Sequence, residues 1–169
     1  MLKTFATICI IGMFTSSCTS KKASRTEGSH EAEQDLTMIV GTYTSGDSKG
    51  LYSFRFNEEN GTATALSEAE VENPSYLVPS ADGKFIYAVS EFSNEQAAAN
   101  AFAFNKEEGT FRLLNTQKTG GEDPCYIITN GSNVVTANYS GGSISVFPID
   151  KDGSLLPASE VVKFKGSGA

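Results

Sequence analysis

The sequence predicts an all-β fold made of short antiparallel strands that repeat along most of the chain. Alternating apolar runs such as LYSFRF, AFAF and ISVF are each followed by an acidic turn that ends on glycine, at Gly61, Gly109 and Gly153. These hairpin turns lie 48 and then 44 residues apart. No segment of this region shows a convincing helical apolar period. Four short strands in a repeat of about 45–50 residues are typical of a β-propeller, whose blades bury their faces against one another.

One complete blade can be read directly from the sequence, and it contains the acidic turn that ends at Gly109. Its predicted strands, named A to D, are Ser75–Pro79, Phe85–Ser90, Ala101–Phe104 and Phe111–Asn115. Strand B, FIYAV, has no polar face, which indicates a strand enclosed between neighbouring blades. Residues 94–100, NEQAAAN, are too few to nucleate a helix alone, so we expect them to form the loop between strands B and C.

The start of this blade returns about fifty residues later. NPSYLVPSADGKFIYAVSE (73–91) corresponds to DPCYIITNGSNVVTAN (123–138), and the three residues missing from the second copy fall in its turn, so that Glu91 aligns with Asn138. Together with MIVGTYTS near the start of the repeat, the sequence accounts for about two and a half to three blades. Because a propeller needs at least four blades to close, we expect 37–169 to be the N-terminal part of a longer propeller.

The first eighteen residues have the pattern of an export signal. MLK is basic, TFATICIIGMF is apolar, and TSSC ends on Cys18. This order resembles a bacterial lipoprotein signal, in which Cys18 would be lipidated and become the mature N-terminus, although Thr15 stands where leucine is usual. Ordinary secretory cleavage nearby is the alternative. A lipidated Cys18 would hold the protein at a membrane surface without a spanning helix.

Residues 19–36 are polar and have no apolar period, so we expect a flexible tether. His30, the chain's single histidine, lies in this tether and is interpreted as a solvated residue. The residues after Cys18 are basic and include no acidic tract. We therefore expect an exported, membrane-anchored lipoprotein that faces the periplasm of a Gram-negative bacterium.

Charge and cysteine content exclude several kinds of site. The formal net charge is −7, which disfavours a nucleic-acid partner. Cys9 leaves with the signal and Cys18 is lipidated, so Cys125 is alone; we expect it to be a small core residue at the start of a buried strand. The acidic runs in the turns are interpreted as solvated charges. No metal site and no cofactor are expected.

Three strings connect the chain to a known family. NPSYLVPSADGKFIYAVSE, GLYSFRF and ANYSGGSISVFPID together resemble the 6-phosphogluconolactonase-like lactonase family, from about Met38 to Ala169. The resemblance implies a seven-bladed propeller that hydrolyses a sugar lactone, typically 6-phosphoglucono-δ-lactone. We also expect the full-length protein to be a monomer. The family's histidine-bearing motif and basic residues would follow Ala169, so no catalytic residue is carried over and this chain alone is expected to be inactive.

Blade geometry brings two kinds of strand end to one face of the propeller, where ligand sites usually lie. The polar residues there are Asn73, Ser75 and Asp123 at the starts of A strands, and Thr42, Tyr43, Glu91, Asn138 and Tyr139 at the ends of B strands. We expect the substrate's hydroxyl groups to be bound by Asn73, Ser75, Asp123, Asn138 and Tyr139.

Glu91 is the catalytic candidate within the chain, because a carboxylate at this position could position or activate a water. The alternative is that these side chains cap loops and satisfy backbone groups. At the level of the whole protein, the alternative to a lactonase is a non-catalytic propeller, tethered at the envelope, that binds a sugar or a protein partner.

Overall fold

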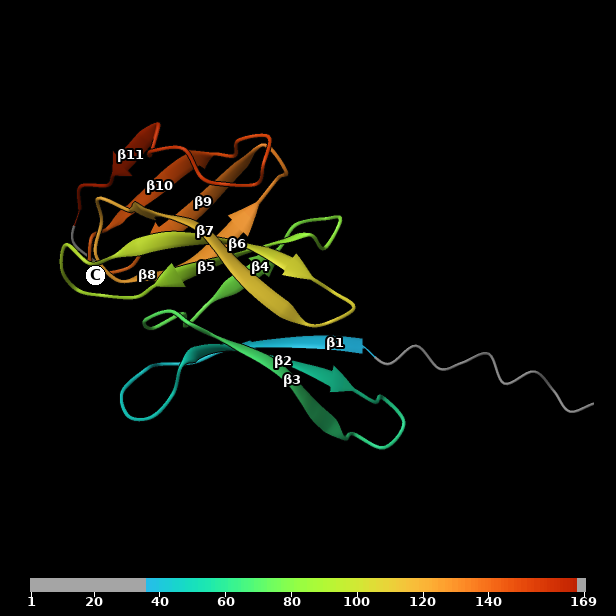
Figure 1. The fold of residues 1–169 in the computed structure, drawn as a ribbon. Helices are drawn as coiled ribbons and strands as arrows, with labels where there is room; N and C mark the ends of the chain where they lie inside the picture. Colours follow the sequence, from blue (N-terminus) through green and yellow to red (C-terminus); the bar gives the residue numbers. More distant parts are fainter. Residues whose placement is uncertain (1–35, 167–169) are drawn as a thin grey trace, which may run out of the picture. The chain divides into compact units, whose positions relative to one another are not determined.

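The computed structural model describes residues 36–166, and every regular element in that part of the chain is a β-strand. The predicted signal at 1–18, with the lipidation site Cys18, lies outside the described residues, as does nearly all of the predicted tether. Three antiparallel sheets follow one another along the chain (Figure 1). Among the described residues no helix is long and apolar enough to cross a membrane.

The first sheet has three strands, β1 (Leu36–Gly41), β2 (Gly50–Phe56) and β3 (Ala63–Glu70), paired in that order. These correspond to strands B, C and D of a blade. The acidic turn that ends at Gly61 joins β2 to β3, as the sequence predicts, and the glycine has the positive φ of 71° that such a turn requires.

The second sheet is the complete blade, in the order β4 (Leu77–Pro79), β5 (Phe85–Ser90), β6 (Ala98–Asn105) and β7 (Thr110–Lys118). The predicted bounds of strand B are confirmed. The predicted loop at 94–100 is wrong in its last three residues, because β6 begins at Ala98 and pairs with β5 and β7 from there. Small buried side chains explain the longer strand: residues 98–100 are 3% exposed or less, and alanines fit where two blades approach closely.

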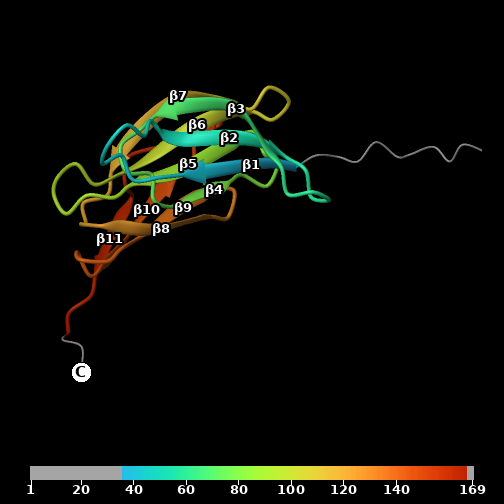
Figure 2. The same ribbon diagram turned by 90° about the horizontal axis from the view of Figure 1, so that it is seen from below.

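The third sheet is also complete, with β8 (Pro124–Thr129), β9 (Asn133–Asn138), β10 (Ser143–Pro148) and β11 (Glu160–Lys163). The described residues therefore hold two four-stranded blades and one three-stranded blade, within the predicted range. The first strands of the second and third blades, β4 and β8, lie against each other, as Figure 2 shows from below.

Two apolar cores lie between successive blades, and strand β5 contributes to both. Ile86 and Ala88 point into the core shared with the first blade, whereas Tyr87 and Val89 point into the core shared with the third. All four side chains are 1% exposed or less. This alternation confirms that a strand without a polar face is enclosed on both sides.

The acidic glycine turns of the second and third blades each pack on the blade before them. Ser53 Oγ donates a hydrogen bond of 2.6 Å to the carbonyl of Gly109, and Tyr87 Oη donates one of 3.1 Å to the carbonyl of Gly153. A Cβ added at Gly153, where φ is +87°, would lie 2.1 Å from the ring of Phe85. Gly109 and Gly153 are thus required both by the turn conformation and by the close packing between blades.

Candidate functional site

The starts of the second and third blades are built on the same backbone turn. Asn73 and Asp123 each precede a proline and have left-handed φ angles of 47° and 52°; Asn and Asp tolerate this region better than other side chains. The carbonyl of Asn73 accepts the N–H of Glu91 at 3.0 Å, and the carbonyl of Asp123 accepts the N–H of Tyr139 at 2.9 Å.

These two backbone bonds correct the predicted alignment of the repeats. Glu91 is therefore equivalent to Tyr139 and not to Asn138. The backbone N–H groups of Glu91 and Tyr139 donate the same hydrogen bond, and each residue lies one position beyond the end of its B strand. Ser90 and Asn138, the last strand residues, are buried instead. The one-residue shift reverses the direction of the side chain, as it does in any strand.

The Glu91 carboxylate is held by hydroxyl groups from two other segments. Tyr43 Oη, from the loop after β1, donates to Glu91 Oε2 at 2.9 Å, and the hydroxyl of Ser75, just before β4, donates to the same oxygen. Among the described residues both bonds end on Oε2, so Oε1 is left to accept from water or a ligand. The site therefore presents an oriented carboxylate.

Electrostatics keeps Tyr43 protonated in this arrangement. The hydrogen bond to Glu91, together with burial and the negative charge of that carboxylate, raises the pKa of Tyr43 above its ordinary value, against a smaller lowering by Ser75. The phenol therefore stays a hydrogen-bond donor at neutral and mildly alkaline pH.

Asn73 acts mainly as a structural link. Its Oδ1 accepts from the backbone N–H and the hydroxyl of Thr44 at 3.1 and 3.0 Å, and its Nδ2 donates to the carbonyl of Glu91 at 3.3 Å. These bonds tie the loop after β1 to the second blade. The side chain of Thr42 is likewise occupied, because it bonds Ser48 and the carbonyl of Gly50.

The other predicted binding residues do not gather at Glu91. Asn138 is 2% exposed; its Nδ2 donates to the hydroxyls of Ser143 and Ser145, and its Oδ1 accepts from Thr136. Tyr139 is 82% exposed. Asp123 is half-buried at the turn before β8. Of the predicted set, Ser75 and Tyr43 are the side chains that meet Glu91.

The expectation that Cys125 is a core residue is wrong, because the thiol is exposed. Strand β8 has a register shift between Pro124 and Tyr126, so Cys125 is the extra residue of a bulge and does not alternate inward. Its neighbour Tyr126 is also exposed and packs on Tyr76, with ring centroids 4.8 Å apart. The fifty-residue spacing of the two tyrosines is the sequence signal that could have singled them out.

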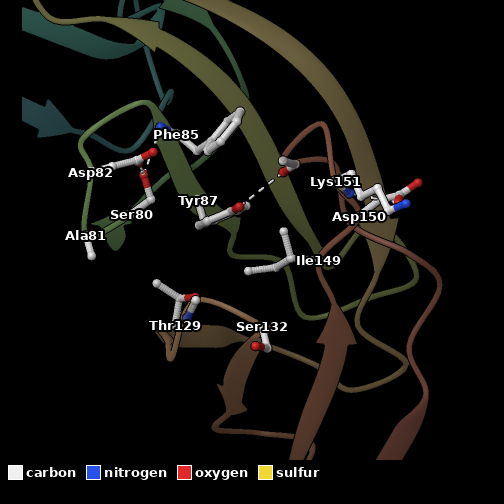
Figure 3. Close-up of a pocket in the computed structure, with 12 residues that line it drawn as sticks. Ser80, Ala81, Asp82, Phe85, Tyr87, Thr129, Ser132, Ile149, Asp150 and Lys151 are labelled. Atoms are coloured by element: carbon white, nitrogen blue, oxygen red, sulfur yellow. Dashed lines mark hydrogen bonds between the residues drawn. The ribbon is translucent and has the colours of Figure 1, made fainter.

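A cavity of about 480 Å³ lies between the second and third blades at the opposite ends of their strands. Figure 3 shows its lining, with the Tyr87 phenol directed at the backbone of the facing turn. Ser80 donates to Asp82, and Thr129 donates to the carbonyl of Asn133, so its polar groups are largely committed to the protein. No group of three or more potential metal ligands occurs within 36–166.

Comparisons with known proteins agree with the strings found in the sequence. Residues 37–169 match the model of a family described as lactonase, seven-bladed β-propeller. A 6-phosphogluconolactonase of Bacillus subtilis is 38% identical over 128 residues, covering 72% of this chain and 36% of the relative. A 6-phosphogluconolactonase of Formosa agariphila is 34% identical, covering 78% of this chain and 38% of that protein.

Solved structures give the same result. A Bacteroides fragilis protein provisionally named 6-phosphogluconolactonase is 70% identical with a TM-score of 0.80, over 82% of this chain and 39% of the other. A periplasmic gluconolactonase of Pseudomonas aeruginosa is 30% identical with a TM-score of 0.69, over 75% of this chain and 38% of the other. The chain thus spans 36–39% of the length of these four relatives. The chain belongs to the family of seven-bladed β-propeller lactonases.

Proposed function

We propose that the complete protein is a lactone hydrolase that opens a sugar lactone to the free sugar acid. The observation that carries this proposal is the match of the whole folded region to a lactonase family, joined to an oriented carboxylate at the predicted face. The main catalytic groups are proposed to lie beyond Ala169, with the residues described here forming one side of the site.

The reaction adds one water across the ring ester. The water oxygen bonds the carbonyl carbon, a base takes its proton, and the ring C–O bond breaks as the ring oxygen gains a proton. Glu91 Oε1 accepts a hydrogen bond from the attacking water, while Tyr43 and Ser75 hold Oε2 and fix the carboxylate's direction. The Glu91 side chain thus positions the water.

We further propose that the substrate is an unphosphorylated sugar lactone. Glu91, Glu122 and Asp123 lie in the segments that end at this face, and the chain carries a net charge of −7. Such a surface disfavours the approach of a phosphate dianion. The proposed export of the protein argues in the same direction, because phosphorylated sugar lactones are cytoplasmic metabolites.

We also propose where the protein lies in the cell: Cys18 is lipidated, residues 19–36 form the tether, and the propeller faces the periplasm. Metabolic labelling with a tagged fatty acid would mark the wild type and leave Cys18→Ala unmarked. Label retained by Cys18→Ala would refute lipidation at this residue.

The test of function is lactone hydrolysis by the complete protein, expressed from residue 19 to remove the lipid. Glucono-δ-lactone and 6-phosphoglucono-δ-lactone should be compared by acid release, with the spontaneous rate subtracted. We expect a higher kcat/KM for the neutral lactone. Preference for the phosphorylated lactone would overturn the substrate proposal alone. Hydrolysis of neither, with sugar binding retained, would favour a non-catalytic binding propeller.

A further inference from the structure

Two exposed tyrosine rings lie side by side at the first strands of the second and third blades. Tyr76 and Tyr126 are 43% and 42% exposed, their ring centroids are 4.8 Å apart, and their planes are tilted by 50°. Each stands two residues after a proline, Pro74 or Pro124; Tyr76 directly precedes β4 and Tyr126 lies in β8, and these two strands lie against each other. The pair is therefore a repeated feature of the fold.

The two rings belong to neither apolar core between the blades. Each ring packs against the other and leaves a large part of its surface to solvent, and no described residue bonds either phenol hydroxyl. A pair of half-exposed rings outside the cores is a surface suited to a ligand that has one apolar face.

The polar cluster described above is connected to this pair through the chain. Ser75, which bonds the Glu91 carboxylate, directly precedes Tyr76, and the exposed Cys125 directly precedes Tyr126. One face of a six-membered sugar lactone presents C–H groups, whereas its rim presents hydroxyls. An exposed ring pair, together with an open carboxylate oxygen held by the residue before Tyr76, matches that division.

We propose that Tyr76 and Tyr126 form a platform on which the C–H face of the sugar lactone ring rests, with a rim hydroxyl or the attacking water directed to Glu91. This inference rests on the proposed function and names how the same site holds its substrate. The platform uses the rings and not the phenol hydroxyls. It therefore predicts that phenylalanine can replace either tyrosine.

The first test is kinetic and uses the complete protein. Tyr76→Ala and Tyr126→Ala should each raise KM for glucono-δ-lactone about tenfold with kcat little changed, whereas Tyr76→Phe stays near wild type. Leu113→Ala is the matched control, because Leu113 is 51% exposed on the outer strand β7. Melting temperatures of all variants identify any loss of folding. Alanine variants that fold normally with an unchanged KM would overturn the platform and leave the lactonase proposal standing.

The second test does not depend on catalysis. Cys125 is exposed beside Tyr126, so its rate of reaction with an aromatic disulfide reagent reports on occupancy of the platform, with Cys125→Ser as the background. Saturating glucono-δ-lactam, an analogue that is not opened by water, should slow the labelling about threefold or more in the wild type and have no effect in Tyr76→Ala. An unchanged rate in the wild type would overturn the platform. If the wild type hydrolyses no lactone but is protected, the proposed function fails while the platform stands.

Discussion

Replacing Tyr87 by phenylalanine tests how one blade holds the next. The Tyr87 side chain is 1% exposed, and its hydroxyl donates a 3.1 Å hydrogen bond to the carbonyl of Gly153, a buried residue in a turn of the third blade. Phenylalanine keeps the ring in the core and removes only this donor. The carbonyl is then left buried without a partner, which costs about 1–3 kcal/mol of unfolding free energy.

The same substitution has a pH signature. Burial raises the pKa of Tyr87 to about 12, with smaller contributions from the negative charges of Asp82 and Asp152. In the unfolded chain tyrosine ionises near pH 10. The wild type should therefore lose stability as the pH rises from about 10 to 12, because the unfolded state releases this proton first. Tyr87→Phe cannot lose this contribution, so its deficit should shrink over that pH range.

The measurement is equilibrium unfolding of the complete protein in urea at pH 7, 10 and 11. Tyr139→Phe is the matched control, because it removes the same hydroxyl from a side chain that is 82% exposed and should change stability by less than about 0.5 kcal/mol. If Tyr87→Phe were as stable as this control at pH 7, the argument that a buried bond joins the two blades would be refuted.

Three further predictions follow from other contacts. Gly153→Ala should destabilise the protein by about 2–4 kcal/mol in urea unfolding, because the added Cβ meets the Phe85 ring and the φ is left-handed; a neutral effect would show that the turn can move. Glu91→Gln should lower kcat/KM for lactone about 100-fold while stability is kept, because the amide oxygen still accepts the two hydroxyl bonds, whereas the amide nitrogen that replaces Oε1 cannot accept a hydrogen bond from the water; a loss below about threefold would remove Glu91 from the reaction. Asn138→Ala should cost about 2–3 kcal/mol and leave KM unchanged, since its amide bonds only neighbouring hydroxyls; a raised KM with normal stability would restore it as a binding residue.

The repeat made the fold predictable, because turn glycines and enclosed apolar strands are local signals. The three acidic turns end on glycines whose φ angles are 71°, 72° and 87°, so each had to be glycine for a backbone reason that the sequence displays. The bounds of β5 were also predictable, since the sequences on either side of this strand strongly favour turns. The start of β6 was not, because alanine in a close blade interface looks the same in sequence as alanine in a loop.

The site was less predictable because it depends on single-residue register. A bulge in β8 exposes Cys125, and the shortened turn after that strand displaced the predicted alignment so that Glu91 was matched with Asn138. Neither the bulge nor the shift has a composition signal. Each reverses which side of the strand a side chain occupies, so an error of one residue converts a buried amide into a supposed ligand.

The corrected alignment also explains how a repeated backbone forms an asymmetric site. In the second blade the equivalent pair of positions holds Ser75 and Glu91, whereas in the third blade it holds Cys125 and Tyr139. The backbone turn and its left-handed residue are the same in both, but only the second blade receives Tyr43 from the blade before it. Among the described blades, a carboxylate is therefore oriented in the second blade alone, at the position where three segments meet. The tyrosines two residues after each proline occur in both the second and the third blade. Repetition supplies the platform, and the difference between repeats supplies the polar group beside it.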